Sequence, residues 1–247
     1  MSNEVDVLVK KKEGLLLDLM RTTSNLPLAK LRDVPTSHHA HKEIVKLVQR
    51  LFLSGSNVQT VVFSAVESGG GSTFISTRVA EILANQVGEP VCLVDANFRS
   101  PRVNEQVEVE EGDAARSENS RDELTFMPVG LDFAQARTSN LWLAVYRPGQ
   151  ADIPRLASLD RFQNMIDDLR RDFTYIVIDA PPLGEYPDAA LFARMSDGLV
   201  MVVEANDTRR DTAHKAKEML QASGVPILGA VLNKRTFPIP ESVYRRL

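Results

Sequence analysis

Three stretches of this sequence carry residues that could bind phosphate groups and a metal ion. The first is Ser64–Thr73, with the sequence SAVESGGGST, and its glycines are Gly69, Gly70 and Gly71. Backbone N–H groups of successive glycines can point into one concavity, and a following helix adds the partial positive charge of its N-terminus. The stretch therefore predicts an anion-binding turn, with the hydroxyl of Ser72 or Thr73 available to magnesium. A turn that only caps the helix through Ser72 is the alternative.

The other two stretches end in aspartates. Asp95 closes the apolar run Pro90–Val94, and Asp179 closes Tyr175–Ile178, just before Ala-Pro-Pro. The carboxyl ends of parallel strands meet at one edge of a sheet, where ligands of such folds bind. Carboxylates there suit hydrated magnesium and its phosphates, so we expect Ser72, Asp95 and Asp179 as metal ligands. Asp95 and Asp179 are also the candidate catalytic remnants, and simple capping of the following turns is the alternative.

Alternating strands and helices must position these residues. Short apolar runs rich in valine predict buried strands, and apolar residues at helical spacing predict the helices between them. The expected strands are 58–65, 90–94, 141–146, 175–178, 198–203 and 227–232, and the expected helices are 41–52, 72–87, 158–171 and 207–223. This order predicts an α/β fold of the P-loop NTPase type, with a mostly parallel sheet and helices on both faces.

The rest of the chain suggests three parts. We expect an N-terminal extension with an interaction helix over 1–57, without a strand, then a nucleotide-binding domain over 58–236 and a tail over 237–247. Residues 103–139 are the least regular part of the domain. Within them, 108–123 is acidic and poor in apolar residues, which predicts a solvated loop or, as the alternative, an acidic binding surface.

Composition excludes several classes of function. The net charge of −4 argues against nucleic acid as a partner, because a basic stripe is its usual footprint. The single cysteine, Cys92, cannot form an internal disulfide and is consistent with a reducing cytoplasm. No apolar run reaches the length of a transmembrane helix, and the N-terminus lacks the apolar core of a signal peptide. We therefore expect a cytoplasmic protein that reaches a membrane only through a partner.

The three stretches together resemble the cytoplasmic domain of bacterial tyrosine kinases. The matching patterns are the glycine loop, Leu-Val-Asp followed by Arg99 and Pro101, and Ile-Asp-x-Pro-Pro, and the likeness covers about residues 40–247. The resemblance implies ATP or ADP with magnesium as cofactor, and Asn233 beside the nucleotide base. It also implies a role in exopolysaccharide production with a polysaccharide co-polymerase of the inner membrane. A possible homo-oligomer follows from the likeness of Glu43, Lys46 and Arg50 to the family's oligomerisation motif.

The sequence departs from the family at positions that the family uses for catalysis. In the resemblance, Gly71 stands at the position of the Walker A lysine that reaches the β- and γ-phosphates, and Asn97 replaces a second aspartate. The tyrosine-rich tail is reduced to Tyr244, and Glu67 brings a carboxylate near the loop. These losses predict a pseudo-enzyme that binds nucleotide weakly or not at all. The alternative is an active autokinase or ATPase that uses another cation, such as Arg99 or Arg102.

A dinucleotide-binding site is a rival prediction for the same loop. Gly69-x-Gly71 follows a strand and opens a helix, and Asp95 lies near the distance expected for a ribose-binding acid. However, the third glycine of that pattern is Phe74, which is too large for close packing of helix on strand. The Ala-Pro-Pro stretch after Asp179 also has no role in such a site.

Overall fold

A computed structural model gives the structure of the chain and describes residues 29–31, 36–55, 57–100, 107–109, 124–130, 140–146 and 157–236. Arg102, the acidic stretch 110–123, and the tail with Tyr244 lie outside the described residues, so the predictions made for them stay predictions. Among the described residues, no helix combines the length and the apolarity that crossing a bilayer demands.

Six parallel strands form the centre of the sheet. All but the outermost of them, Ile227–Asn233, are largely buried, as expected for apolar strands covered on both faces, whereas that outer strand is partly exposed. Across the sheet they run β6 (Leu141–Tyr146), β3 (Val91–Asp95), β7 (Tyr175–Asp179), β2 (Thr60–Ala65), β8 (Gly198–Glu204) and β9 (Ile227–Asn233). Each lies within two residues of the predicted bounds, and the predicted fold class is confirmed.

Three further strands extend the sheet beyond β6. They are β5 (Leu124–Gly130), β1 (Ala29–Leu31) and β4 (Val107–Val109). β5 runs antiparallel to β6, β1 parallel to β5, and β4 antiparallel to β1. The prediction of no strand before residue 58 is therefore wrong at β1, and the irregular stretch 103–139 contains β4 and β5. Two of these strands have only three residues, and β5 contains Pro128, a residue that weakens a strand signal because it cannot donate to the ladder.

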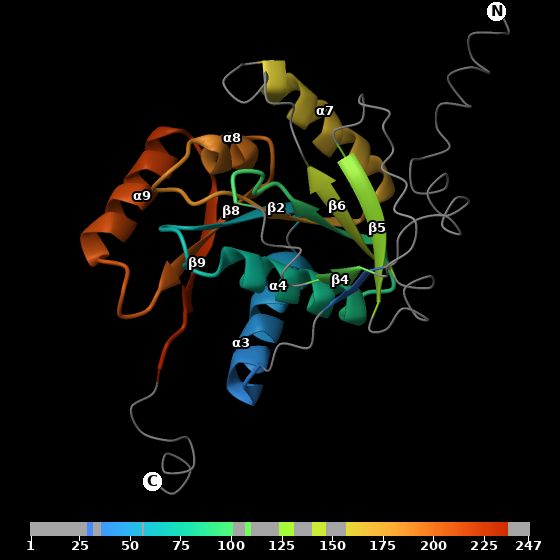
Figure 1. Cartoon of the computed structure of the whole chain (residues 1–247), viewed down its shortest axis with the longest axis horizontal. Helices are drawn as coiled ribbons and strands as arrows, with labels where there is room; N and C mark the ends of the chain where they lie inside the picture. Colours follow the sequence, from blue (N-terminus) through green and yellow to red (C-terminus); the bar gives the residue numbers. More distant parts are fainter. Residues whose placement is uncertain are drawn as a thin grey trace, which may run out of the picture.

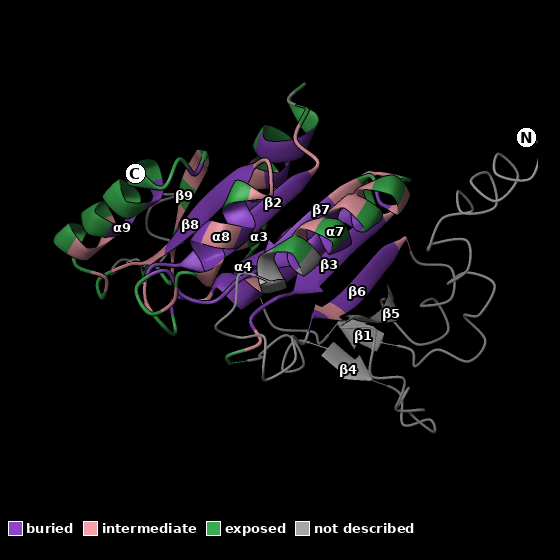
Figure 2. Ribbon diagram, turned by 90° about the horizontal axis from the view of Figure 1, so that it is seen from above, coloured by how far each residue is buried: buried purple, intermediate pink, exposed green. Residues whose placement is uncertain are grey.

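Helices cover both faces of the sheet (Figure 1). On one face lie α3 (His38–Val48), the π-helical turn η2 (Gln49–Leu53) and α4 (Ser72–Gln86), and on the other lie α7 (Ala157–Asp172), α8 (Asp188–Arg194) and α9 (Arg210–Ala222). Figure 2 shows the buried strands between exposed helix faces. The short helix α8 was not predicted. With only seven residues, it carries too few periods for an apolar pattern to stand out.

The helix α3 belongs to the core rather than lying beside it. Its Ile44 and Val48, with Leu51 and Phe52 of η2, are buried in the same apolar cluster as α4 and the centre of the sheet. The ring of Phe52 meets Tyr175 edge-on, with centroids 5.5 Å apart. The interaction helix expected in the N-terminal extension is thus packed against the nucleotide-binding fold through one face.

A polar network closes the amino-terminal edge of the sheet. Asp197, just before β8, accepts hydrogen bonds on Oδ2 from the backbone N–H groups of Gln59 and Thr60, at 2.7 and 2.8 Å. Its Oδ1 accepts from Arg170 Nη2 of α7 at 3.2 Å, and Gln59 Nε2 donates to the carbonyl oxygens of Arg170 and Phe173. The network therefore ties the start of β2 to α7 and β8.

We expect Asp197→Ala to lower the free energy of unfolding by about 1.5–3 kcal/mol, because two backbone donors and a guanidinium lose their acceptor. Chemical denaturation of the purified chain measures this. Asp168→Ala is the control, since Asp168 pairs with Arg171 where both side chains are mostly exposed, and it should cost less than about 1 kcal/mol. Equal losses for the two variants would contradict a structural role for Asp197.

Candidate functional site

The glycine loop joins β2 to α4 in a conformation that side chains other than glycine rarely adopt. Gly69 and Gly71 have φ of 85° and 88°, in the left-handed region. The loop is closed by a hydrogen bond from Gly70 N–H to the Glu67 carbonyl oxygen at 3.2 Å, and α4 begins directly after Gly71, at Ser72. The prediction of a glycine turn opening a helix is confirmed in its geometry.

Parallel pairing brings the two aspartates together beside this loop. Asp95 and Asp179 are register partners at the ends of β3 and β7, and both are fully buried. Thr73, in the first turn of α4, donates its hydroxyl hydrogen to Asp179 Oδ2 at 2.7 Å. The loop, the helix start and both carboxylates therefore meet at the carboxyl edge of the sheet, where the carboxylates are buried while Ser68 and Gly69 of the loop are exposed.

Burial dominates the electrostatics of this site. It raises the pKa of Asp179 to about 7, opposed by hydrogen bonding from Thr73 and reinforced by the charge of Asp95. Asp179 Oδ1 and Asn97 Oδ1 are buried without a hydrogen-bond partner among the described residues. Buried oxygen acceptors beside paired carboxylates fit a hard divalent cation, so the residues present fit magnesium. Within the described ranges, histidine, cysteine and acidic side chains form no cluster of three or more that could hold a metal by themselves.

Nearby cations are held in ion pairs. Arg99, which follows β3, pairs with Asp188 of α8 at 2.8 Å and lies over the ring of Tyr186, 4.4 Å from its centroid. On α4, Arg78 pairs with Glu81. Lys234, after β9, pairs with Glu204 at 2.9 Å in the same way. The loop itself contributes no cation, because Glu67 is the charged residue between Ser64 and Thr73.

Asn233 lies against the loop from the last strand. Its side-chain Nδ2 donates to the Gly70 carbonyl oxygen at 3.0 Å, across 163 residues of sequence. A Cβ built on Gly71 would collide with the same Asn233 amide nitrogen. Asn233 is indicated in the sequence by the family resemblance alone, and no local pattern signals this contact.

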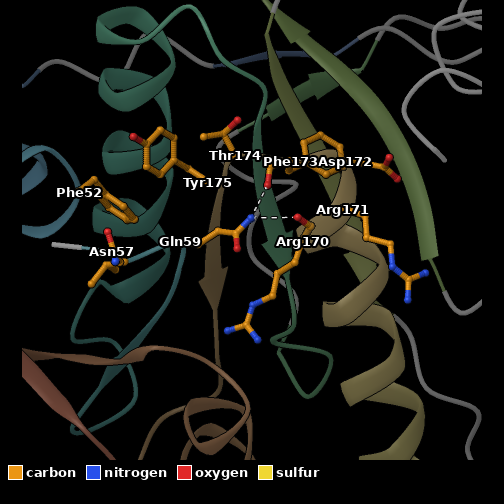
Figure 3. Close-up of a pocket in the computed structure, with 10 residues that line it drawn as sticks. Phe52, Asn57, Gln59, Arg170, Arg171, Asp172, Phe173, Thr174 and Tyr175 are labelled. Carbon is orange, nitrogen blue, oxygen red and sulfur yellow. Dashed lines mark hydrogen bonds between the residues drawn. The ribbon is translucent and has the colours of Figure 1, made fainter. Parts of the chain in front are cut away.

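A separate pocket of about 480 Å³ opens at the amino-terminal edge of the sheet, at the opposite ends of the strands (Figure 3). Gln59, Arg170 and Tyr175 line it together with Phe52. Gln59 donates hydrogen bonds to backbone oxygens, drawn as dashed lines, and Arg170 pairs with Asp197. The protein itself therefore supplies bonding partners for these two polar side chains of the pocket, and the glycine loop and the two aspartates beside it lie at the other edge.

The fold and this site define the class of P-loop nucleotide-binding proteins. The ParA family model, described as NUBPL iron-transfer P-loop NTPase, matches residues 57–245. The chain is 31% identical over 185 residues to the tyrosine-protein kinase CpsD of Streptococcus agalactiae, covering 73% of this chain and 77% of that protein. It therefore belongs to the ParA-type P-loop NTPases, within the family of bacterial tyrosine-protein kinases.

Two further similarities extend this placement. The chain is 28% identical over 220 residues to the succinoglycan biosynthesis transport protein ExoP of Rhizobium meliloti, covering 82% of this chain and 26% of ExoP. The solved structure of the chimerical protein CapA2B2 aligns with a TM-score of 0.66 at 21% identity, covering 89% of this chain and 99% of that chain. At this identity the structure supports the fold alone. The resemblance recognised from the three motifs is confirmed.

The buried Asp179 makes stability depend on pH. The folded chain keeps the Asp179 proton up to about pH 7, whereas the unfolded chain releases it near pH 4. The free energy of unfolding therefore falls as pH rises between these values. The variant Asp179→Asn has no carboxyl to ionise at this position and therefore lacks this loss of stability. We expect the Tm of the variant to exceed that of the parent by about 3–8 °C at pH 8 and by little at pH 4. Thermal unfolding across this range, with Asp160→Asn on the exposed start of α7 as control, measures it. A difference independent of pH would contradict the raised pKa.

Proposed function

We propose that this chain is a pseudo-enzyme of the bacterial tyrosine kinase family, acting in the cytoplasm as a regulatory or scaffolding partner in exopolysaccharide production. The observation that carries the proposal is a phosphate loop with its backbone geometry intact and no cation of its own. ExoP, a biosynthesis transport protein by name, supports the polysaccharide context. A polysaccharide co-polymerase of the inner membrane is the partner that the family resemblance suggests, and a second copy of the chain is another.

Charge explains why such a loop would bind nucleotide weakly. A charge-assisted hydrogen bond contributes roughly 1.5–3 kcal/mol, so its loss weakens binding by about 10- to 100-fold. Phosphoryl transfer suffers more, since it depends on positioning and on charge stabilisation, and one missing cation can cost roughly 10³–10⁵ in rate. Arg99 is the substitute that the sequence suggested, and its pairing with Asp188 and stacking on Tyr186 support the view that it is engaged elsewhere.

We further propose that the missing lysine corresponds to Ser72 and not to Gly71, as the sequence patterns had suggested. In the pattern Gly-Lys-Ser/Thr, the glycine ends the loop, the lysine begins the helix and the hydroxyl serves magnesium. Gly71 is the left-handed residue that ends this loop, Ser72 begins α4, and Thr73 donates to Asp179. This register supports the assignment of Thr73, alongside Asp95 and Asp179, to the magnesium site.

In this proposal some residues of the site would bind magnesium and others would orient the phosphates. Asp179, with a free Oδ1 and with Oδ2 held by Thr73, would hold magnesium next to Asp95. A bound magnesium ion would neutralise phosphate charge. The N–H groups of the glycine loop and the start of α4 would orient the phosphates. Deprotonation of Asp179 near neutral pH would accompany metal binding, because the charged carboxylate is the ligand.

The surviving magnesium residues favour one alternative, an active ATPase or autokinase that recruits a cation from outside the loop. Incubation of the full chain with labelled ATP and magnesium separates the two functions. We expect no tyrosine, Tyr244 included, to be labelled within minutes, and phosphate release to stay close to the buffer blank. Stoichiometric labelling on that timescale would establish the alternative instead.

The register of the loop can be tested by restoring the lysine. We expect Ser72→Lys to tighten the binding of magnesium–ADP by about 10- to 100-fold, because it returns one charge-assisted contact at the start of α4. Calorimetric titration measures the affinity.

Gly71→Lys is the matched control, with the same added charge one residue earlier. At Gly71 the new side chain would need φ near +88° and would meet Asn233, so we expect a lower Tm and no gain in affinity. Tighter binding of magnesium–ADP by Gly71→Lys but not by Ser72→Lys would support the earlier assignment of the missing lysine to Gly71. If neither stably folded variant binds better, the loop has diverged beyond its lysine and the domain is an interaction module only.

A further inference from the structure

The edge strand β9 reaches the glycine loop through one side chain. Asn233 is the last residue of β9, paired in register with Glu204 of β8, and β8 in turn pairs with β2, the strand that leads into the loop. From there Asn233 Nδ2 donates to the Gly70 carbonyl oxygen at 3.0 Å. The loop and β9 are therefore connected both through the sheet and directly through this hydrogen bond.

The contact falls where the loop has least room. A Cβ on Gly70 would lie 2.9 Å from Ala65 Cβ, and a Cβ on Gly71 would meet the Asn233 amide. Gly70 is thus pressed against the end of β2, and the asparagine amide fills the space that any side chain at Gly71 would need. Rotation of the Gly70–Gly71 peptide would break the hydrogen bond from Asn233.

The hydrogen bond also fixes the orientation of the Gly70–Gly71 peptide group. In a planar trans peptide, the carbonyl oxygen of one residue and the N–H of the next point in opposite directions. Because Asn233 holds the Gly70 oxygen on its own side, the Gly71 N–H is turned away from Asn233. Orientation of backbone N–H groups is what makes a glycine loop an anion site.

We propose that Asn233 is a positioning residue that fixes the Gly70–Gly71 peptide and thereby holds the loop in its anion-accepting conformation. This inference rests on the anion site of the proposed function. It differs from the role that the family resemblance implies, in which the asparagine lies beside the base. The two roles make different predictions for a ligand that has phosphates but no base.

The test compares magnesium–ADP with magnesium–pyrophosphate, titrated calorimetrically into the parent, Asn233→Ala and Asn233→Asp. Aspartate keeps the size of the side chain and, when ionised, cannot donate to Gly70. For a positioning residue we expect both ligands to weaken in the same proportion, by about fivefold or more. Asn85→Asp, on an exposed position of α4, controls for the change of charge. Loss of ADP affinity with pyrophosphate unchanged would overturn the proposal in favour of a base contact.

Backbone amide exchange in the ligand-free proteins provides a second readout that needs no ligand. We expect amides of the loop, Gly69–Thr73, to exchange at least about fivefold faster in both Asn233 variants than in the parent and in Asn85→Asp. Unchanged exchange in the loop would overturn the proposal. If the parent binds neither ligand, the anion site of the proposed function fails, while the exchange result still decides whether Asn233 holds the loop.

Discussion

The site depends on two carboxylates placed side by side in a dry part of the protein. The register of β3 against β7 makes Asp95 and Asp179 direct neighbours at the ends of their strands, both fully buried. Two negative charges cannot share such a place without a proton or a cation. Burial, together with the charge of Asp95, raises the pKa of Asp179, and the hydrogen bond from Thr73 opposes this shift without cancelling it.

This arrangement is costly to keep if it has no use. Burying a carboxylate carries a desolvation cost that apolar residues of similar size would avoid. The chain retains both aspartates, the left-handed glycines and Thr73, while its loop carries Glu67 and no cation. Under the proposed function, residues that would hold magnesium are present while the charge that drives transfer is missing, and such a site would bind without turnover.

The parts that could be predicted from the sequence are those whose signal is local. Buried strands of the parallel sheet are continuous apolar runs, and the turn glycines and strand-end aspartates follow them at once. The short strand β1 was missed because its partners lie far away in the sequence, and β5 because Pro128 interrupts its pattern. The link between Asn233 and Gly70 depends on the order β2, β8, β9 in the sheet and on a side-chain rotamer, and residue spacing indicates neither.

The extension of the sheet has a consequence for the order in which the chain folds. Among the described strands, β1 pairs only with β5 and β4, and β5 alone joins this group to the central strands, through its antiparallel pairing with β6. β1 therefore joins the central sheet only once β5 has docked on β6. Ordering such distant segments costs loop-closure entropy before any contact repays it. The outer strands should thus be the last to form during folding and the first to detach, leaving the six-stranded sheet and its buried aspartates as the cooperative unit.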